Sequence, residues 1–337
     1  MPAVIRQTAF LERINTMSLT DCTLPGLHHV TAITADAQKN INFYCDVLAL
    51  RLVKLTVNFD DPASYHLYYG DELGRPGTVL TFFAWPGAVP GRAGPPQATA
   101  TAFSVPTHAM DDWVQRLAAH GVESQLQAHR FGEPVLAFRD PDGMQLELIG
   151  ANLSADSPSR PRLAGSVPES MAIVGIHSVT LTERKTDATI HLLTEVMKYQ
   201  SAGSEDNRRR YQAGTNDHGP GTIVDIVHEP AMGHGTLGAG VVHHVAYRTP
   251  DDAQQAAWRD KIAAHFPHVS PVMDRCYFHS IYFREPGGVL FEIATVHPGF
   301  TADQALGELG KKLMLPPWLE AQRAEIERAV PPIQLPR

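Results

Sequence analysis

The chain has 337 residues, of which 43% are hydrophobic and 19% are charged, and its formal net charge is −8 at pH 7. This length allows two domains, and the composition is that of a globular protein rather than a disordered or fibrous one. The acidic balance argues against nucleic acid as a partner, because phosphate binding needs a basic surface. The one dense basic run, Arg208–Arg210, is interpreted as a solvated loop. No apolar run approaches the roughly 18 residues of a membrane span, so we expect no membrane partner.

The three cysteines, Cys22, Cys45 and Cys276, are far apart and lack the spacing of a zinc ribbon or a disulfide framework. They fit a reducing compartment, so we expect a cytoplasmic protein. Residues 1–24 form an N-terminal extension without the pattern of a secretory signal, and Met17 is a possible true start.

The strongest feature is an internal repeat. Three segments share a pattern around one or two histidines: Gly-Leu-His-His-Val-Thr at 26–31, Gly-Ile-His-Ser-Val-Thr at 175–180 and Val-His-His-Val at 242–245. Apolar residues at helical spacing follow the first two copies. The pattern therefore predicts strands over 27–34 and 176–183, each followed by a helix.

A second pair of matching segments, Phe-Arg-Asp-Pro-Asp-Gly at 138–143 and Phe-Arg-Glu-Pro-Gly-Gly at 283–288, predicts a strand end and a turn in each place. Together the two repeats divide most of the chain into four units, each read as a strand, a helix and about three strands. These units are 27–85, 99–150, 174–230 and 242–297.

The four units group into two predicted domains, 25–155 and 156–300. The Pro-rich stretch 151–168 has little apolar content and is the best boundary between them. Residues 301–337 are predicted to be a C-terminal tail with one helix over 317–330.

Two histidines at repeat-related positions, His29 and His244, and the mid-strand Glu292 are candidate metal ligands. A carboxylate among apolar neighbours is costly to bury unless something pairs it, and a divalent metal would do so. Two imidazoles and one carboxylate are the facial ligand set of non-heme Fe(II) oxygenases, although manganese or zinc also accepts it. Each residue alone is more often a hydrogen-bonded histidine or a salt-bridged glutamate, but their recurrence in the repeat favours the metal.

The other units carry degenerate copies of this set. Ser178 stands where the first unit has His29, and alignment of the second unit places Ala102 opposite His244. Glu147 is retained opposite Glu292, but one carboxylate binds a transition metal poorly, so Glu147 is interpreted as structural. We therefore expect one metal site, shared by the first and fourth units.

The first unit offers no fourth ligand. Aligning its last strand with that of the fourth unit places Phe82 opposite Glu292. An isomerase that fills its metal sphere would need a donor here, whereas redox chemistry on a bound aromatic needs an opening.

These residues resemble the vicinal oxygen chelate superfamily, which includes extradiol dioxygenases, glyoxalase I and antibiotic-resistance proteins. The closer resemblance is to its hydroquinone-type ring-cleaving dioxygenases, over about residues 27–320. It implies an α+β fold of two domains built from paired βαβββ modules, four in all, each curving a mixed sheet around a cavity. The matching stretches are GLHHVTAI at 26–33, FYCDVLALRLVKLTVNFDDPASYHLYYGD at 43–71, GTVLTFFAWP at 77–86 and DRCYFHSIYFREPGGVLFEIAT at 274–295.

The resemblance also implies Fe(II), sometimes Mn(II), as cofactor on the three ligands, O2 as co-substrate and a small aromatic substrate. It gives roles around the metal and the substrate to His28, Thr31, His243, Arg275 and Tyr282. Arg275 and Tyr282 would contact the substrate oxygen. His28 and His243 would either move protons or orient the ligand rings.

Three functions remain open. The first is a metal-dependent dioxygenase that opens a hydroquinone or related phenolic ring. The second is a glyoxalase-like isomerase or transferase on the same fold, and the third is a protein that sequesters an aromatic compound. A homo-oligomer is possible. His66 and His279 have no assigned role, and Asp60 is expected in a loop near the site.

Overall fold

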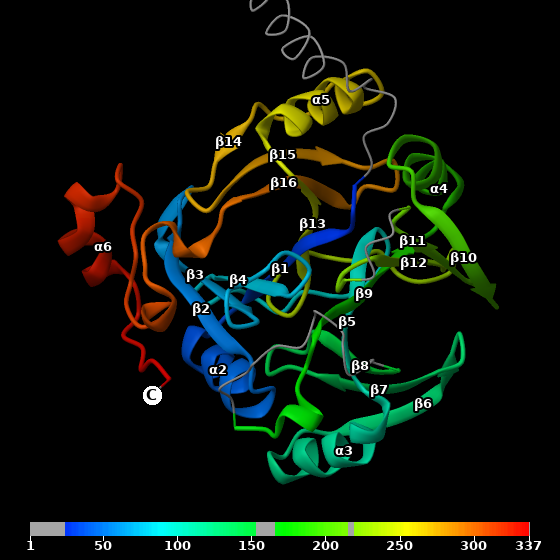
Figure 1. Cartoon of the computed structure of the whole chain (residues 1–337), viewed down its shortest axis with the longest axis horizontal. Coiled ribbons are helices and arrows are strands. Elements are labelled where there is room, and N and C mark those ends of the chain that lie inside the picture. Colours follow the sequence, from blue (N-terminus) through cyan, green and yellow to red (C-terminus); the bar gives the residue numbers. More distant parts are fainter. Residues whose placement is uncertain (1–23, 153–165, 215–218, 337) are drawn as a thin grey trace, which may run out of the picture.

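The computed structural model describes residues 24–152, 166–214 and 219–336. Two eight-stranded mixed sheets lie side by side, and each curls into a half-barrel with its helices on the outer face (Figure 1). The α+β fold of four modules is confirmed. Within the described ranges, no helix is long and apolar enough to cross a membrane. Most of the predicted extension 1–24, with Met17 and Cys22, and residues 153–165 of the predicted boundary lie outside the described part.

The first sheet joins the first and fourth units. In spatial order its strands are β14 (Met273–Asp274), β15 (Phe278–Arg284), β16 (Leu290–Pro298), β13 (Val242–Thr249), β1 (Leu27–Thr34), β4 (Val79–Ala84), β3 (Asp61–Gly70) and β2 (Arg51–Asn58).

The second sheet joins the third and second units. Its order is β10 (Gln200–Glu205), β11 (Arg208–Gln212), β12 (Ile223–His228), β9 (Gly175–Glu183), β5 (Gln97–Pro106), β8 (Gln145–Ala151), β7 (Glu133–Arg139) and β6 (Ser124–Arg130). Each sheet therefore contains strands from both predicted domains, and the domain bounds themselves stay a prediction.

The helices follow the first strand of each unit. α2 (Ala37–Asn42) and α4 (Asp187–His191) each run into one π-helical turn, while α3 (Met110–Ala119) and α5 (Asp252–Ala263) are regular; α6 (Arg323–Ala329) lies in the tail. The apolar residues of α5 bury against the sheet, with Trp258 and Ile262 fully covered. Apolar stripes at helical spacing are what hold such short helices to a sheet.

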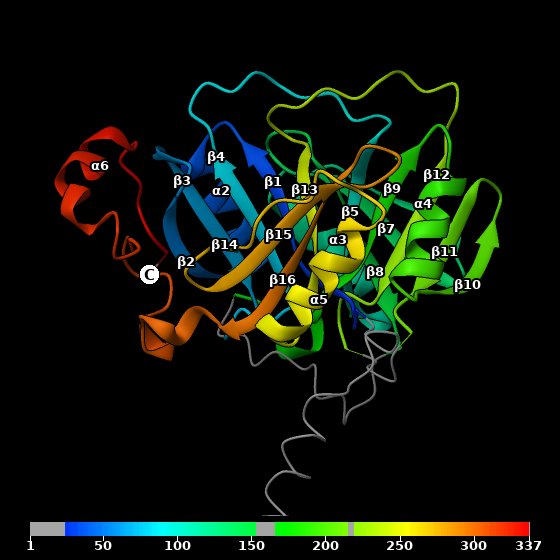
Figure 2. The same cartoon turned by 90° about the horizontal axis from the view of Figure 1, so that it is seen from above.

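The central strands are buried on both faces. Every residue of β1 and of β9 is buried, because helices cover one side and the half-barrel closes over the other. The predicted strands 27–34 and 176–183 are confirmed almost to the residue. Two long connections, 85–96 and 229–241, run side by side at one end of the molecule, where Pro90 pairs with Ala239 (Figure 2).

The interpretation of Arg208–Arg210 as a solvated loop is wrong. These residues begin strand β11, and Arg210 is buried with its guanidinium against Asp225, 2.9 Å from Nε to Oδ1. The buried carboxylate of Asp225 requires a cationic partner. Because side chains alternate along a strand, Arg208 and Arg210 point to the same face and both pair with it.

Candidate metal centre

The two His-His pairs lie at matching β-bulges. Strands β1 and β13 pair antiparallel, and their register shifts once beside His28 and once beside His243. A bulge turns two successive side chains toward one side of the sheet, whereas a regular strand would send them to opposite faces. His28 thus reaches the ring of His29, and His243 reaches that of His244.

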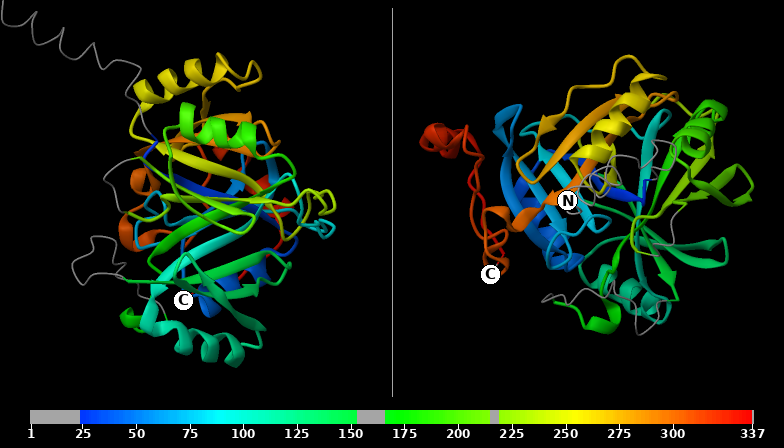
Figure 3. Two further views of the ribbon diagram at one scale, coloured as in Figure 1. Left: turned by 90° about the vertical axis from the view of Figure 1, so that its right-hand side faces the viewer. Right: turned by 45° about the horizontal axis from the view of Figure 1, so that its top comes forward.

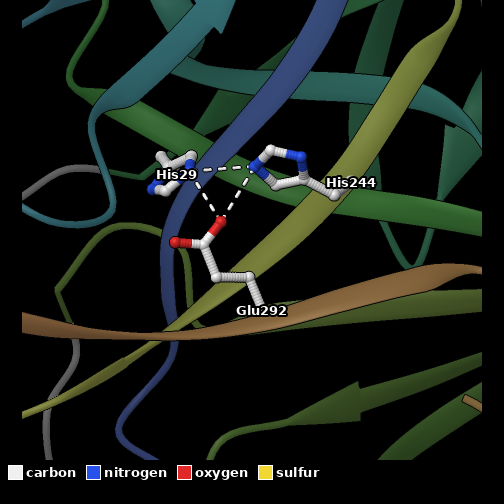
Figure 4. Close-up of side chains that lie close together, drawn as sticks. All are labelled: His29, His244 and Glu292. Atoms are coloured by element: carbon white, nitrogen blue, oxygen red, sulfur yellow. Dashed lines mark hydrogen bonds and ion pairs between the residues drawn. The ribbon is translucent and has the colours of Figure 1, made fainter. Parts of the chain in front are cut away.

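The three predicted ligands converge inside the first half-barrel (Figure 4). Nε2 of His29 lies 3.3 Å from Nε2 of His244, and Oε2 of Glu292 lies 3.4 Å from the first and 2.9 Å from the second. All three side chains are buried. Strands β1, β13 and β16 are adjacent in the sheet, so residues more than 200 positions apart in sequence share one point.

The neighbouring histidines fix which ring nitrogens face this point. Nδ1 of His28 lies 2.9 Å from Nδ1 of His29, and Nδ1 of His243 lies 2.8 Å from Nδ1 of His244. His28 also donates to the backbone of Thr295, so its Nδ1 must accept from His29. Burial, with the facing imidazole, lowers the pKa of both His28 and His243 to about 3, so both rings are neutral.

This arrangement fits a divalent cation. With the Nδ1 hydrogen of His29 donated to His28, its Nε2 carries a lone pair directed at the other two donors. Ser280 donates to Oε1 of Glu292, while the buried Oε2 accepts no hydrogen bond from any described residue. Convergent, unsatisfied donor atoms are the signature of a metal position.

A small cavity of about 30 Å³ opens beside the three donors. Its apolar walls are the rings of Phe59, Tyr68, Phe83 and Phe278, and its polar lining is Asn58, Asp60, His66, Arg275 and Tyr282. A larger groove of about 840 Å³ lies elsewhere, between α2 and strands β6 to β8, and contains none of the candidate ligands.

Of the residues given roles by the resemblance, Arg275 and Tyr282 face the cavity. Nε of Arg275 donates to the hydroxyl of Tyr282 at 3.2 Å, and its terminal nitrogen pairs with Asp60 at 3.0 Å. Asp274, the residue before Arg275 in the chain, accepts from the backbone of Cys276 instead. His28 and His243 stand behind the ligand rings. The hydroxyl of Thr31 lies 2.8 Å from that of Thr81, and Thr31 does not line the cavity.

Comparison with known proteins identifies the family. A family model described as the Glyoxalase/Bleomycin resistance protein/Dioxygenase superfamily matches residues 26–148 and 175–293.

The chain belongs to this superfamily.

Several relatives within the superfamily match nearly the whole chain. "Putative ring-cleaving dioxygenase MhqO" of Bacillus subtilis is 43% identical over 92% of this chain and 97% of its own. "Chlorohydroquinone/hydroquinone 1,2-dioxygenase" of Sphingobium indicum is 34% identical over 90% and 95%. The crystal structure of a "putative dioxygenase" from Bacillus subtilis superposes with a TM-score of 0.88 at 42% identity, covering 94% and 99%. Glyoxalase I of maize, at 14% identity and a TM-score of 0.58, shares the fold over 80% and 92%.

The strand register corrects two positions in the degenerate copies. Ala246 pairs with Glu292, and the equivalent pair in the first unit is Thr31 with Thr81. The position equivalent to Glu292 in the first unit is therefore Thr81, and the assignment to Phe82 was wrong. A slip of one residue moves a side chain to the other face, and Phe82 is buried in the core instead.

The same reasoning applies to the second sheet. Thr31 pairs with His244, and its counterpart Thr180 pairs with Ala100, so Ala100 rather than Ala102 replaces His244. The sequence alignment of the second unit was therefore two residues out.

The interpretation of Glu147 as structural agrees with its contacts. Both of its oxygens accept from Arg130, and Asp225 beside it accepts from Arg208 and Arg210. Guanidinium groups thus stand in the second half-barrel where the first has its converging donors. These buried carboxylates and guanidinium groups stabilise one another, because removing either partner would leave an uncompensated charge inside the protein.

Sequence reasoning missed most of the cavity wall. Tyr68, Phe83 and Phe278 gave no separate signal because an aromatic residue in a strand is usually core. His66 was left without a role; it lies between the hydroxyls of Tyr68 and Thr81, 2.9 Å from each. Its spacing of two from Tyr68 on one strand face was the available clue. His279, by contrast, pairs with Asp252 at the surface.

Proposed function

We propose that this protein is a metal-dependent dioxygenase that uses O2 to open a hydroquinone or related phenolic ring. The observation that carries the proposal is an open triad of two imidazoles and one carboxylate beside an aromatic-walled cavity. Relatives that are named as ring-cleaving or hydroquinone dioxygenases support it, at 34–43% identity over at least 90% of this chain.

We further propose that His29, His244 and Glu292 hold Fe(II), with Mn(II) as the alternative, as in the extradiol type of enzyme. When bound, the metal would bring a phenol oxygen and O2 together and accept and pass on electrons as both oxygen atoms enter the product. The hydroxyl of Thr81, at the position equivalent to Glu292, is already engaged by Thr31 and His66. We therefore expect the coordination sphere of the metal to lack a protein ligand from this strand.

The other residues act on the small aromatic substrate. Tyr68, Phe83 and Phe278 would contact its faces, since aromatic rings pack well edge to face. Arg275 and Tyr282 would stabilise charge that develops on its oxygen. His28 and His243 hold the ligand rings in one tautomer, so the orienting role is preferred over proton transfer.

The two alternatives fit less well. A glyoxalase-like isomerase or transferase would draw a fourth donor from the position of Thr81, whose hydroxyl is a weak ligand already in use. A sequestering protein has no need of converging metal donors. A cytoplasmic location, consistent with free Cys45 and Cys276, and a homo-oligomer remain proposals.

Oxygen uptake by anaerobically purified, iron-loaded protein tests the function. With hydroquinones of varied substitution we expect uptake of one O2 per ring opened, and at least a 1000-fold loss in Glu292→Gln, on the order of removing an essential group. His279→Ala, a surface histidine of the same unit, is the control and should retain activity. Absence of uptake across the whole series would contradict the proposal.

A further inference from the structure

The turn between β2 and β3 forms one wall of the cavity beside the candidate metal ligands. Asn58, Phe59 and Asp60 line the same space as the candidate metal ligands. The remaining free volume of about 30 Å³ holds a water molecule or two. A benzene ring occupies an engineered cavity of roughly 150 Å³, so a phenolic ring cannot enter until one wall moves.

The wall that can move is this turn. The aromatic walls Tyr68, Phe83 and Phe278 belong to strands hydrogen-bonded on the sheet, whereas Phe59 and Asp60 lie between strands. Asp60 is 63% exposed. Phe59 also packs edge to face on the half-exposed Trp318, with the two ring centroids 5.6 Å apart.

Across the cavity, Arg275 is fixed. Its side chain is 17% exposed, and it follows the hairpin strand β14 and precedes Cys276, which adopts a φ of 68°. A residue other than glycine in this region marks a tightly constrained turn. Arg275 also holds the hydroxyl of Tyr282, and a 3.0 Å ion pair joins it to Asp60 on the movable wall.

We propose that Asp60 is a specificity-determining residue that competes with the substrate for Arg275. With the turn in place, the carboxylate of Asp60 neutralises Arg275 and shuts the cavity. A phenolic ligand must break this pair to enter, and its own ionised oxygen then takes the place of the carboxylate. Phenols that ionise readily would therefore be admitted in preference to neutral rings. This inference rests on the proposed function, because it takes a phenolic ring as the ligand.

Binding of 4-nitrophenolate to the iron-loaded protein under nitrogen tests the proposal by a colour change that needs no ring cleavage. Asp60→Asn should bind the probe about two- to fivefold more tightly, the range for partly exposed ion pairs, and should lower the KM of a substrate with little change in kcat. The control is Asp61→Asn at the start of β3, whose carboxylate accepts from Ser64 instead and which should bind the probe like the wild type.

A double-mutant cycle separates the ion pair from general loosening of the turn. In an Arg275→Gln background, Asp60→Asn should give no further gain in affinity. An equal gain in that background, an unchanged affinity in Asp60→Asn, or no binding of the probe to any variant would overturn the proposal. If the probe binds as described but no oxygen is consumed with hydroquinones, the role of Asp60 stands and the proposed reaction falls.

Discussion

Thr189 has one hydroxyl hydrogen but lies between two buried carboxyl groups. Its Oγ1 is 2.8 Å from Oε2 of Glu183, at the end of β9, and 2.6 Å from Oε2 of Glu285, after β15. Since one hydroxyl donates once, one carboxyl group must itself donate. Glu285 already accepts from the backbone of Gly287 and Val289, so Glu183 is the protonated partner.

The pKa of Glu183 predicts how stability depends on pH. Burial, with the nearby charge of Glu285, raises it to about 8. A carboxyl group with a raised folded-state pKa gives stability that is fully present below its ordinary pKa of 4.5 and is lost as the pH rises through about 8. Glu183→Gln, which mimics the protonated form, should unfold several degrees above the wild type at alkaline pH and at the same temperature under acidic conditions.

The control for this pair is Glu285→Gln, which replaces the group that accepts from the backbone. We expect it to lower the unfolding temperature at every pH, because an amide nitrogen would then face an N–H donor. Thermal unfolding followed by circular dichroism across the pH range measures both variants. Identical curves for Glu183→Gln and the wild type at alkaline pH would show that the pKa of Glu183 is not raised in the folded protein.

At the scale of elements, the tail is tied to strand β2 (Figure 3). Lys54 is fully buried, and its Nζ lies 2.5 Å from Asp303 and 2.6 Å from Gln304. Leu313 of the tail also forms a parallel β-bridge with Leu55 on the same strand. The tail therefore covers β2 with both an ion pair and apolar contact, next to the turn that closes the cavity.

Removing one partner of this buried pair should be costly. Asp303→Ala would leave Lys54 uncompensated and should destabilise the protein by about 3 kcal/mol, measured by urea unfolding. Lys54→Met combined with Asp303→Ala should recover most of the loss, because no charge is then left unpaired. Lys311→Met breaks an exposed pair with Glu308 and should change stability by less than about 1 kcal/mol. A stable Asp303→Ala single variant would mean that the tail does not hold β2.

Helices and strands were predicted well where hydrophobic residues recur periodically. Features that depend on how distant strands pair were predicted poorly. The alternation and helical spacing after His29 and His177 set the strands and helices of the repeat. The run Arg208–Arg210 was predicted to be solvated because charged side chains usually are. The burial of Arg210 depends on carboxylates from other strands, which the local sequence does not reveal. The fourth ligand position was misassigned to Phe82 because the alignment of the two last strands was one residue out, which only the pairing of β4 with β1 reveals.

At the scale of the whole molecule, two similar half-barrels differ in what their centres contain. The first has converging donors from β1, β13 and β16, and the second has guanidinium groups paired with Glu147 and Asp225. The site in the first sheet was predictable because its ligands stand at repeat-related places. The cavity and the Asp60–Arg275 pair were not, since they depend on which turn folds over which sheet.

The central claim is one metal ion per chain, held in the first half-barrel alone. Elemental analysis of protein purified without added chelator measures it directly, with His244→Ala and His279→Ala beside the wild type. We predict one equivalent of iron or manganese in the wild type and in His279→Ala, and almost none in His244→Ala. Two equivalents per chain, or an unchanged content in His244→Ala, would contradict the account.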